Sequence, residues 1–153
     1  MPRPFPTPIG RRLASTAKHV GRAFDAALAA AGGSRPIWLI LIALKGRPLR
    51  NQRELARAVG IEGPTLTHHL DAMEAGGLLT RRRDPGNRRV QVVELTERGE
   101  SAFQAMRAAA GAFDRRLRAG VSDAEVARLG ELLDRLRENV GGGDEPGGGA
   151  ESS

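Results

Sequence analysis

Residues 51–79 read NQRELARAVGIEGPTLTHHLDAMEAGGLL, and residues 80–95 continue as TRRRDPGNRRVQVVEL. The first stretch predicts a short helix that ends at Gly60 and a second helix that begins at Gly63-Pro64, because Gly favours helix ends and Pro favours the first helical turn. The second stretch predicts two arginine-rich strands joined by a turn at residues 84–87. A helix thin enough for the major groove beside a cationic projection is what a protein that reads duplex DNA needs.

Further helices are predicted on both sides of this stretch. Residues 10–31 carry apolar side chains at three- and four-residue steps from Leu13 to Leu28, which indicates an amphipathic helix. Residues 37–44, IWLILIAL, are apolar nearly all round and predict a central helix. Two helices are predicted after the hairpin, over residues 97 to about 118 and over residues 123 to about 139, the second behind a capping box of Ser122 and Glu125.

The predicted fold class is mainly α with a small β-wing, a winged helix-turn-helix with N- and C-terminal dimerisation helices. We expect an extended arm over residues 1–9, a single domain over residues 10–140 and a disordered tail over residues 141–153. Within the domain, residues 35–95 form the DNA-binding lobe. Residues 10–31 and 97–140 carry more apolar surface than one small domain buries easily, which favours a partner chain over an intrachain bundle.

Composition narrows the classes of protein and partner. The net charge is +6, and 22 of the 24 basic residues are Arg, which suits a polyanion, although the codon usage of a GC-rich genome would produce the same excess. Cys is absent, which excludes disulfides and thiolate zinc sites. The first residues lack the apolar core of a signal peptide, and residues 37–44 are too few to span a bilayer. We therefore expect a soluble, cytoplasmic protein without a membrane partner.

The exposed face of the helix that begins near Gly63 carries the residues expected to approach bases. Thr65, Thr67 and His68 are candidates for the major groove, because the early residues of the second helix in such a motif face base edges. Gly63 and Pro64 allow the helix N-terminus to come close to a phosphate. The alternative is a surface helix that contacts nothing.

The arginine-rich hairpin is the second part of the candidate site. Arg81 and Arg83 are expected to contact phosphates, and Arg88, near the tip, is expected to enter the minor groove. Asp84 is expected to pair with Arg88 or Arg89 and hold the turn. Because strand side chains alternate between faces, these arginines do not all face one partner. The alternative is a solvated basic hairpin.

The sequence does not predict a metal site, a cofactor or an enzyme. His68 and His69 are adjacent and point about 100° apart on a helix, so they do not chelate one ion together. His69 lies beside the apolar face and is expected to be packed or hydrogen-bonded. No nucleophile elbow or phosphate-cradling glycine motif occurs in the sequence.

The hairpin and the residues after it resemble the MarR family of bacterial transcriptional regulators. The wing of that family commonly reads Arg, two residues, then Asp-Pro-x-Asp-Arg-Arg, followed after a strand by Leu-Thr-x-x-Gly. This chain has Arg81, then DPGNRR at residues 84–89 and LTERG at residues 95–99. The resemblance in element order extends over residues 10–140. Asn87 stands where the family usually has Asp, and we expect it to accept a turn hydrogen bond.

The resemblance implies a homodimer, formed by the first and last helices, that binds a pseudo-palindromic operator. It implies the groove contacts already assigned to the helix and to Arg88, and a wing held by Asp84 with Arg89. The alternatives are a nucleoid-type protein that coats DNA with little specificity and a winged helix that docks a protein.

Many members of the family respond to small anionic or aromatic ligands, which bind between the dimer helices and the DNA-binding lobe. By resemblance, a ligand cleft here would be lined by His19, Arg22, Phe24, Trp38 and Ile42.

Overall fold

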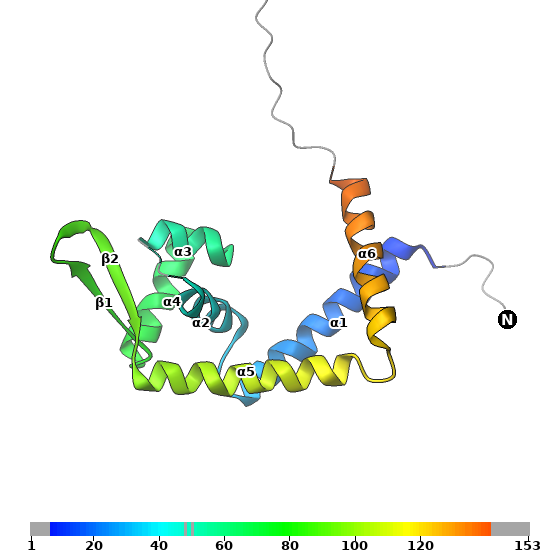
Figure 1. Cartoon of the computed structure of the whole chain (residues 1–153), viewed down its shortest axis with the longest axis horizontal. Coiled ribbons are helices and arrows are strands. Elements are labelled where there is room, and N and C mark those ends of the chain that lie inside the picture. Colours follow the sequence, from blue (N-terminus) through cyan, green and yellow to red (C-terminus); the bar gives the residue numbers. More distant parts are fainter. Residues whose placement is uncertain (1–6, 48, 50, 142–153) are drawn as a thin grey trace, which may run out of the picture. The chain divides into compact units, whose positions relative to one another are not determined.

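The computed structural model describes residues 7–47, 49 and 51–141 (Figure 1). The elements, in order, are α1 (Ile9–Ala30), α2 (Arg35–Gly46), α3 (Gln52–Val59), α4 (Gly63–Ala75), β1 (Leu79–Asp84), β2 (Asn87–Leu95), α5 (Glu97–Leu117) and α6 (Asp123–Val140). The predicted fold class is confirmed, since helices dominate and the two strands form one antiparallel hairpin. The chain forms two compact units, Met1–Phe113 and Asp114–Ser153, with the boundary inside α5.

Both ends of the chain modify the sequence-based expectation. Ile9 is the first residue of α1, so the end of the predicted extended arm is helical, and the Arg12 amide already donates to the Pro8 carbonyl at 3.2 Å. Residues 1–6 of the arm, Pro48 after α2 and residues 142–153 of the predicted tail lie outside the described residues.

Helix α2 is the centre of the first unit, as its apolar sequence predicts. It packs against α1, α3, α4 and β2. Ile40 and Leu41 are fully buried, and Ser34 caps the helix by accepting a hydrogen bond from the Ile37 amide at 3.4 Å. Among the described residues, no single helix is long and apolar enough to cross a membrane, although α1 and α2, which meet at a bend of 75°, pass a length and composition test as a pair.

Part of the apolar seam predicted for dimerisation is instead buried within the first unit. Leu28 of α1 and Phe103 and Met106 of α5 belong to its core. Met106 of α5 can approach the backbone of Gly33 closely because glycine has no side chain. A Cβ at residue 33 would lie 2.3 Å from the Met106 sulfur. The partly buried ring of Trp38 stacks on the buried ring of Phe103, with centroids 5.7 Å apart, at the margin of this core.

Helix α6, in the second unit, begins at the predicted capping box. The Ser122 hydroxyl accepts from the Glu125 amide at 3.1 Å, and the Glu125 carboxylate accepts from the Ser122 amide at 3.0 Å. None of the residues of α6 is buried within the described part of the chain. Leu129 and Val140 are 53% and 84% exposed, so the described residues of the second unit do not cover these apolar side chains.

Candidate nucleic-acid interface

Helices α3 and α4 form the predicted helix-turn-helix. Asn51 caps α3 by accepting from the Glu54 amide at 2.9 Å, and Gly60 ends it in the left-handed conformation with φ of 69°. Burial then fixes the orientation of α4, because its core side chains each contribute roughly 1.5–3 kcal/mol by leaving water. The buried side chains of α4 are Leu66, Leu70 and Met73.

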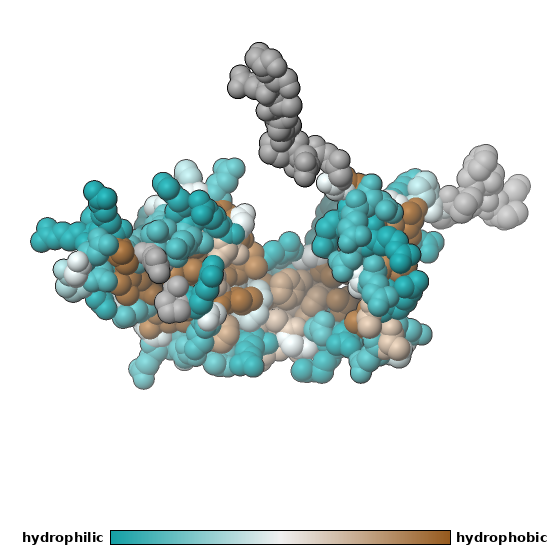
Figure 2. Space-filling view, turned by 45° about the horizontal axis from the view of Figure 1, so that its top comes forward, coloured by the Kyte–Doolittle hydropathy of each residue, from teal (hydrophilic) through white to brown (hydrophobic). Residues whose placement is uncertain are grey.

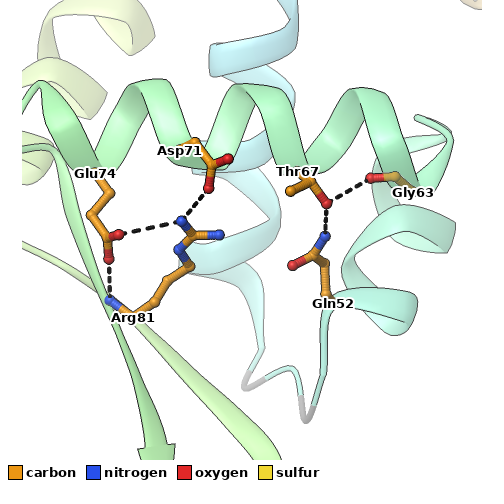
Figure 3. Close-up of polar contacts among 6 residues, drawn as sticks. All are labelled: Gln52, Gly63, Thr67, Asp71, Glu74 and Arg81. Atoms are coloured by element: carbon orange, nitrogen blue, oxygen red, sulfur yellow. Dashed lines mark hydrogen bonds and ion pairs between the residues drawn. The ribbon is translucent and has the colours of Figure 1, made fainter.

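The opposite face of α4 carries the residues predicted to approach bases. Pro64, Thr65 and His68 are exposed, as that prediction requires. Thr67 is half-buried, and its hydroxyl donates to the Gly63 carbonyl at 3.0 Å while accepting from the side-chain amide of Gln52 (Figure 3). His69 is also half-buried and lies edge-on to His68, with ring centroids 5.8 Å apart.

The tip of the wing is tighter than the sequence indicates. Strand β1 runs to Asp84 and β2 starts at Asn87, so the turn is shorter than the predicted residues 84–87, with a register shift between Arg83 and Asp84. Asp84 Oδ1 accepts from the Gly86 amide at 2.8 Å, and Asn87 Oδ1 accepts from the Arg89 amide at 3.2 Å. Both side chains thus accept from a backbone amide two residues later in the chain.

The ion pair predicted between Asp84 and Arg88 or Arg89 is not formed among the described residues. Asp84 Oδ1 instead accepts a hydrogen bond from a backbone amide of its own turn. An aspartate can hold a turn in this way without a cation. The tip is therefore held by side-chain-to-backbone hydrogen bonds, and the guanidinium groups of Arg88 and Arg89 are left to line a groove.

Arg81, predicted to contact a phosphate, instead joins the wing to α4. Its side chain is 14% exposed and pairs with Asp71, and with Glu74 at 3.2 Å (Figure 3). Its backbone amide also donates to Glu74 at 3.0 Å. The hydrogen bond to Asp71 is the main cause that raises the pKa of Arg81. The backbone amide and the guanidinium of Arg81 both bind carboxylates of α4. We therefore do not include Arg81 among the proposed DNA contacts.

A cationic groove lies between the N-terminus of α3 and the wing. Its volume is about 730 Å³, and it is lined by Asn51, Gln52, Arg53, Arg83, Arg88, Arg89 and Gln91. Among the described lining residues, four carry guanidinium groups and none is acidic. Arg83 is oriented by a hydrogen bond to the Arg88 carbonyl at 3.2 Å. A concave surface with this charge attracts phosphates, and guanidinium groups bind them with paired N–H donors.

Several residues of this groove are not predicted from the sequence. Arg53 and Gln52 belong to the first turn of α3. From the sequence, α3 is expected to pack behind α4, the helix predicted to approach bases, and not to contact DNA itself. Gln91 lies opposite Arg83 in the strand register, and directly opposed strand residues share a face. The alternation of β2 could have indicated Gln91, but nothing local in the sequence brings Arg53 to the wing.

The residues predicted to line a ligand cleft fall into two groups. Phe24 and Trp38 are partly buried and pack on aromatic side chains of α5, the ring of Phe24 at 5.2 Å from that of Phe113. His19, Arg22 and Ile42 are exposed.

The fold and the groove define a winged helix-turn-helix protein with a cationic groove between α3 and the wing. Figure 2 shows hydrophilic side chains extending from the hairpin, the segment at the left. The model of the MarR family matches residues 34–90, which include α2, the helix-turn-helix and most of the wing.

Solved structures extend this likeness over most of the chain. The transcriptional regulator PA3341 is 31% identical, with a TM-score of 0.69, over 88% of this chain and 98% of that protein. The transcriptional repressor CouR, bound to a 23-mer DNA duplex, is 26% identical, with a TM-score of 0.74, over 84% of this chain and 92% of CouR. CouR from Rhodococcus jostii RHA1 bound to p-coumaroyl-CoA gives 26% identity and a TM-score of 0.67, over 85% and 92% of the two chains. The chain belongs to the MarR family of transcriptional regulators.

Proposed function

We propose that the chain is a sequence-specific repressor that binds duplex DNA as a homodimer. The observation that carries the proposal is the cationic groove between the N-terminus of α3 and the wing, whose lining residue Gln52 contacts Thr67 of α4. A helix placed in the major groove brings flanking cations onto the phosphates of the same duplex segment. The DNA-bound structure of CouR, a repressor of the same fold, supports this use of the surface.

The proposal gives each exposed residue a distinct role. Thr65 and His68 approach base edges, where an imidazole can donate to guanine. Gly63 and Pro64 place the amides of the helix N-terminus near a phosphate. Phosphate contacts fix the register of the protein and come from Arg53, Arg83 and Arg89. Arg88, at the exposed tip, enters the minor groove.

The homodimer is supported by apolar side chains that are exposed in the described part of the chain. On α1, Ile9 is 62% and Leu13 is 38% exposed. On α6, Leu129 and Val140 are also exposed. Sedimentation of the full chain at micromolar concentration should give the mass of two chains; a single-chain mass would exclude the proposed form.

Selection of duplexes from a random pool, followed by footprinting of the enriched sequence, tests the DNA-binding proposal. We expect one discrete site of two half-sites related by a pseudo-twofold axis, about one helical turn apart. Uniform protection without an enriched sequence would indicate a nucleoid-type protein. Absence of DNA binding at low salt would leave protein docking as the role of the surface.

Control by a small anionic or aromatic ligand is part of the proposal, supported by the p-coumaroyl-CoA complex of CouR. Trp38 is the only tryptophan of the chain and stacks on Phe103, so its fluorescence reports changes at this margin of the core. Titration with aromatic acids and their coenzyme A thioesters should change that fluorescence and weaken operator binding at the same concentrations. A panel that changes neither would remove ligand control from the proposal.

Replacing Arg53 with alanine is expected to weaken binding to every duplex by about tenfold, because one phosphate is left without its guanidinium partner regardless of base sequence. The slope of log affinity against log salt should become less negative by about one for each phosphate that is no longer neutralised. The measurement is fluorescence anisotropy at several salt concentrations. Arg107→Ala removes the same charge from an exposed position on α5 outside the groove and should change affinity by roughly twofold or less. Equal losses of affinity in the two variants would contradict a specific role for Arg53.

A further inference from the structure

We propose that Thr67 recognises a thymine through its methyl group, and that Gln52 is a positioning residue that holds the Thr67 side chain in the orientation this requires. The inference rests on the proposed DNA-binding function and assigns a base type to one position of that site. It concerns a side chain whose hydroxyl would otherwise be taken as the group that reads DNA.

The hydroxyl of Thr67 is already used within the protein. Its proton is donated to the Gly63 carbonyl at 3.0 Å, one helical turn earlier. Its oxygen accepts a hydrogen bond from the side-chain amide of Gln52, which reaches across from α3. A hydroxyl has one proton to donate, so Thr67 has none left for guanine N7 or O6 or for a phosphate. Figure 3 shows the hydroxyl turned toward Gly63 and Gln52, and the methyl group on the other side of Cβ.

The position of Thr67 is that of a residue close to bases. It is the fifth residue of α4, within the turns that enter a groove, and it precedes the exposed His68. It is half-buried, and its partner Gln52 lines the cationic groove. A duplex held in that groove lies next to Gln52 and close to Thr67, and we infer that it meets the methyl group, because the hydroxyl is occupied by Gly63 and Gln52.

The chemistry of the major groove gives such a methyl group one natural partner. Thymine alone among the four bases presents a C5-methyl group there, and the methyl of threonine packs on it. The next residue, His68, presents an exposed imidazole that reads hydrogen-bonding groups. Neighbouring residues of α4 are thus suited to two different base types.

Two substitutions separate the methyl from the hydroxyl. Thr67→Val keeps the methyl and removes the hydroxyl, and valine in a helix holds one strongly preferred rotamer, so it does not need Gln52 to orient it. Thr67→Ser keeps the hydroxyl and its two partners and removes the methyl. Both variants of the full chain are compared with the wild type on the duplex that the wild type selects from a random pool.

Replacing each thymine of that duplex in turn by uracil removes the C5-methyl group alone. For the wild type and for Thr67→Val, we expect one uracil position per half-site to weaken binding by about fourfold, the effect of one buried methyl group. For Thr67→Ser, affinity for the unmodified duplex should fall by about the same factor, and the sensitivity to that uracil should disappear.

Gln52→Ala tests the positioning role. Gln52 also lines the groove, so its loss affects the overall affinity for DNA. The measured quantity is therefore the discrimination between thymine and uracil, in two backgrounds. In the wild-type background, Gln52→Ala should reduce this discrimination. In the Thr67→Val background, that discrimination should persist. The inference is overturned if Thr67→Val loses the uracil response while Thr67→Ser keeps it, or if no uracil position responds to either substitution. A wild type that selects no discrete sequence overturns the proposed repressor and this inference together.

Discussion

Replacing Gly99 with alanine is expected to lower the free energy of unfolding by about 3 kcal/mol, the upper part of the range for overpacking a buried site. Gly99 is buried in the first turn of α5, where a Cβ would lie 1.9 Å from the carbonyl oxygen of Leu78 and 2.9 Å from its carbon. That oxygen is backbone and also accepts from the Thr96 amide at 3.1 Å, so it does not move aside as a flexible side chain would.

The measurement is urea denaturation followed by circular dichroism. Gly10→Ala is the matched control, since Gly10 also lies in the first turn of a long helix but has open space where a Cβ would stand. It should leave stability unchanged or raise it by up to about 1 kcal/mol, because alanine favours helix. Similar midpoints for the Gly99 variant and the wild type would show that the start of α5 does not pack closely on the backbone of Leu78.

Replacing Arg81 with alanine is expected to weaken DNA binding by about thirtyfold, or about 2 kcal/mol. The substitution leaves Asp71 and Glu74 without their cation, next to the face proposed to meet a polyanion. Those carboxylates are 60% and 41% exposed, so solvent screens them and we take the low end of the range for breaking an interfacial charge pair. The wing also loses its link to α4.

The charge argument has its own control. In Arg81→Ala combined with Asp71→Asn and Glu74→Gln, the uncompensated negative charge is removed, and we expect most of the affinity to return in anisotropy titrations. Thermal melting establishes that both variants are folded. If the triple variant binds as weakly as Arg81→Ala, charge is not what Arg81 contributes.

Sequence patterns predicted the helix-turn-helix closely, because its determinants are local. Gly60 ends α3, Asn51 caps it and the Leu66–Leu70 spacing gives the buried face of α4, and each acts within a few residues. The role of Arg81 could not be predicted in this way. A wing arginine reads as a free cation until the fold places two carboxylates of α4 beside it.

The contrast between local patterns and tertiary packing also explains how far the groove and the apolar helix faces could be predicted. Arg53 joins the wing arginines only through tertiary packing, which no local period encodes. Conversely, the helical spacing of Phe103 and Met106 shows that this face is buried but not against what, and both residues belong to the core of their own unit. Leu129 has the same kind of spacing and stays exposed, so periodicity identifies a contact face without naming its partner.

The link through Arg81 also has a consequence for how the proposed repressor would be switched off. One guanidinium and one backbone amide tie β1 to α4, so the surfaces proposed to read the major and minor grooves are linked directly to each other. A signal that released DNA would then not need to disorder either reader. In the proposed homodimer, it would have to change the spacing or tilt between the two DNA-binding lobes, so that both no longer match one turn of the double helix.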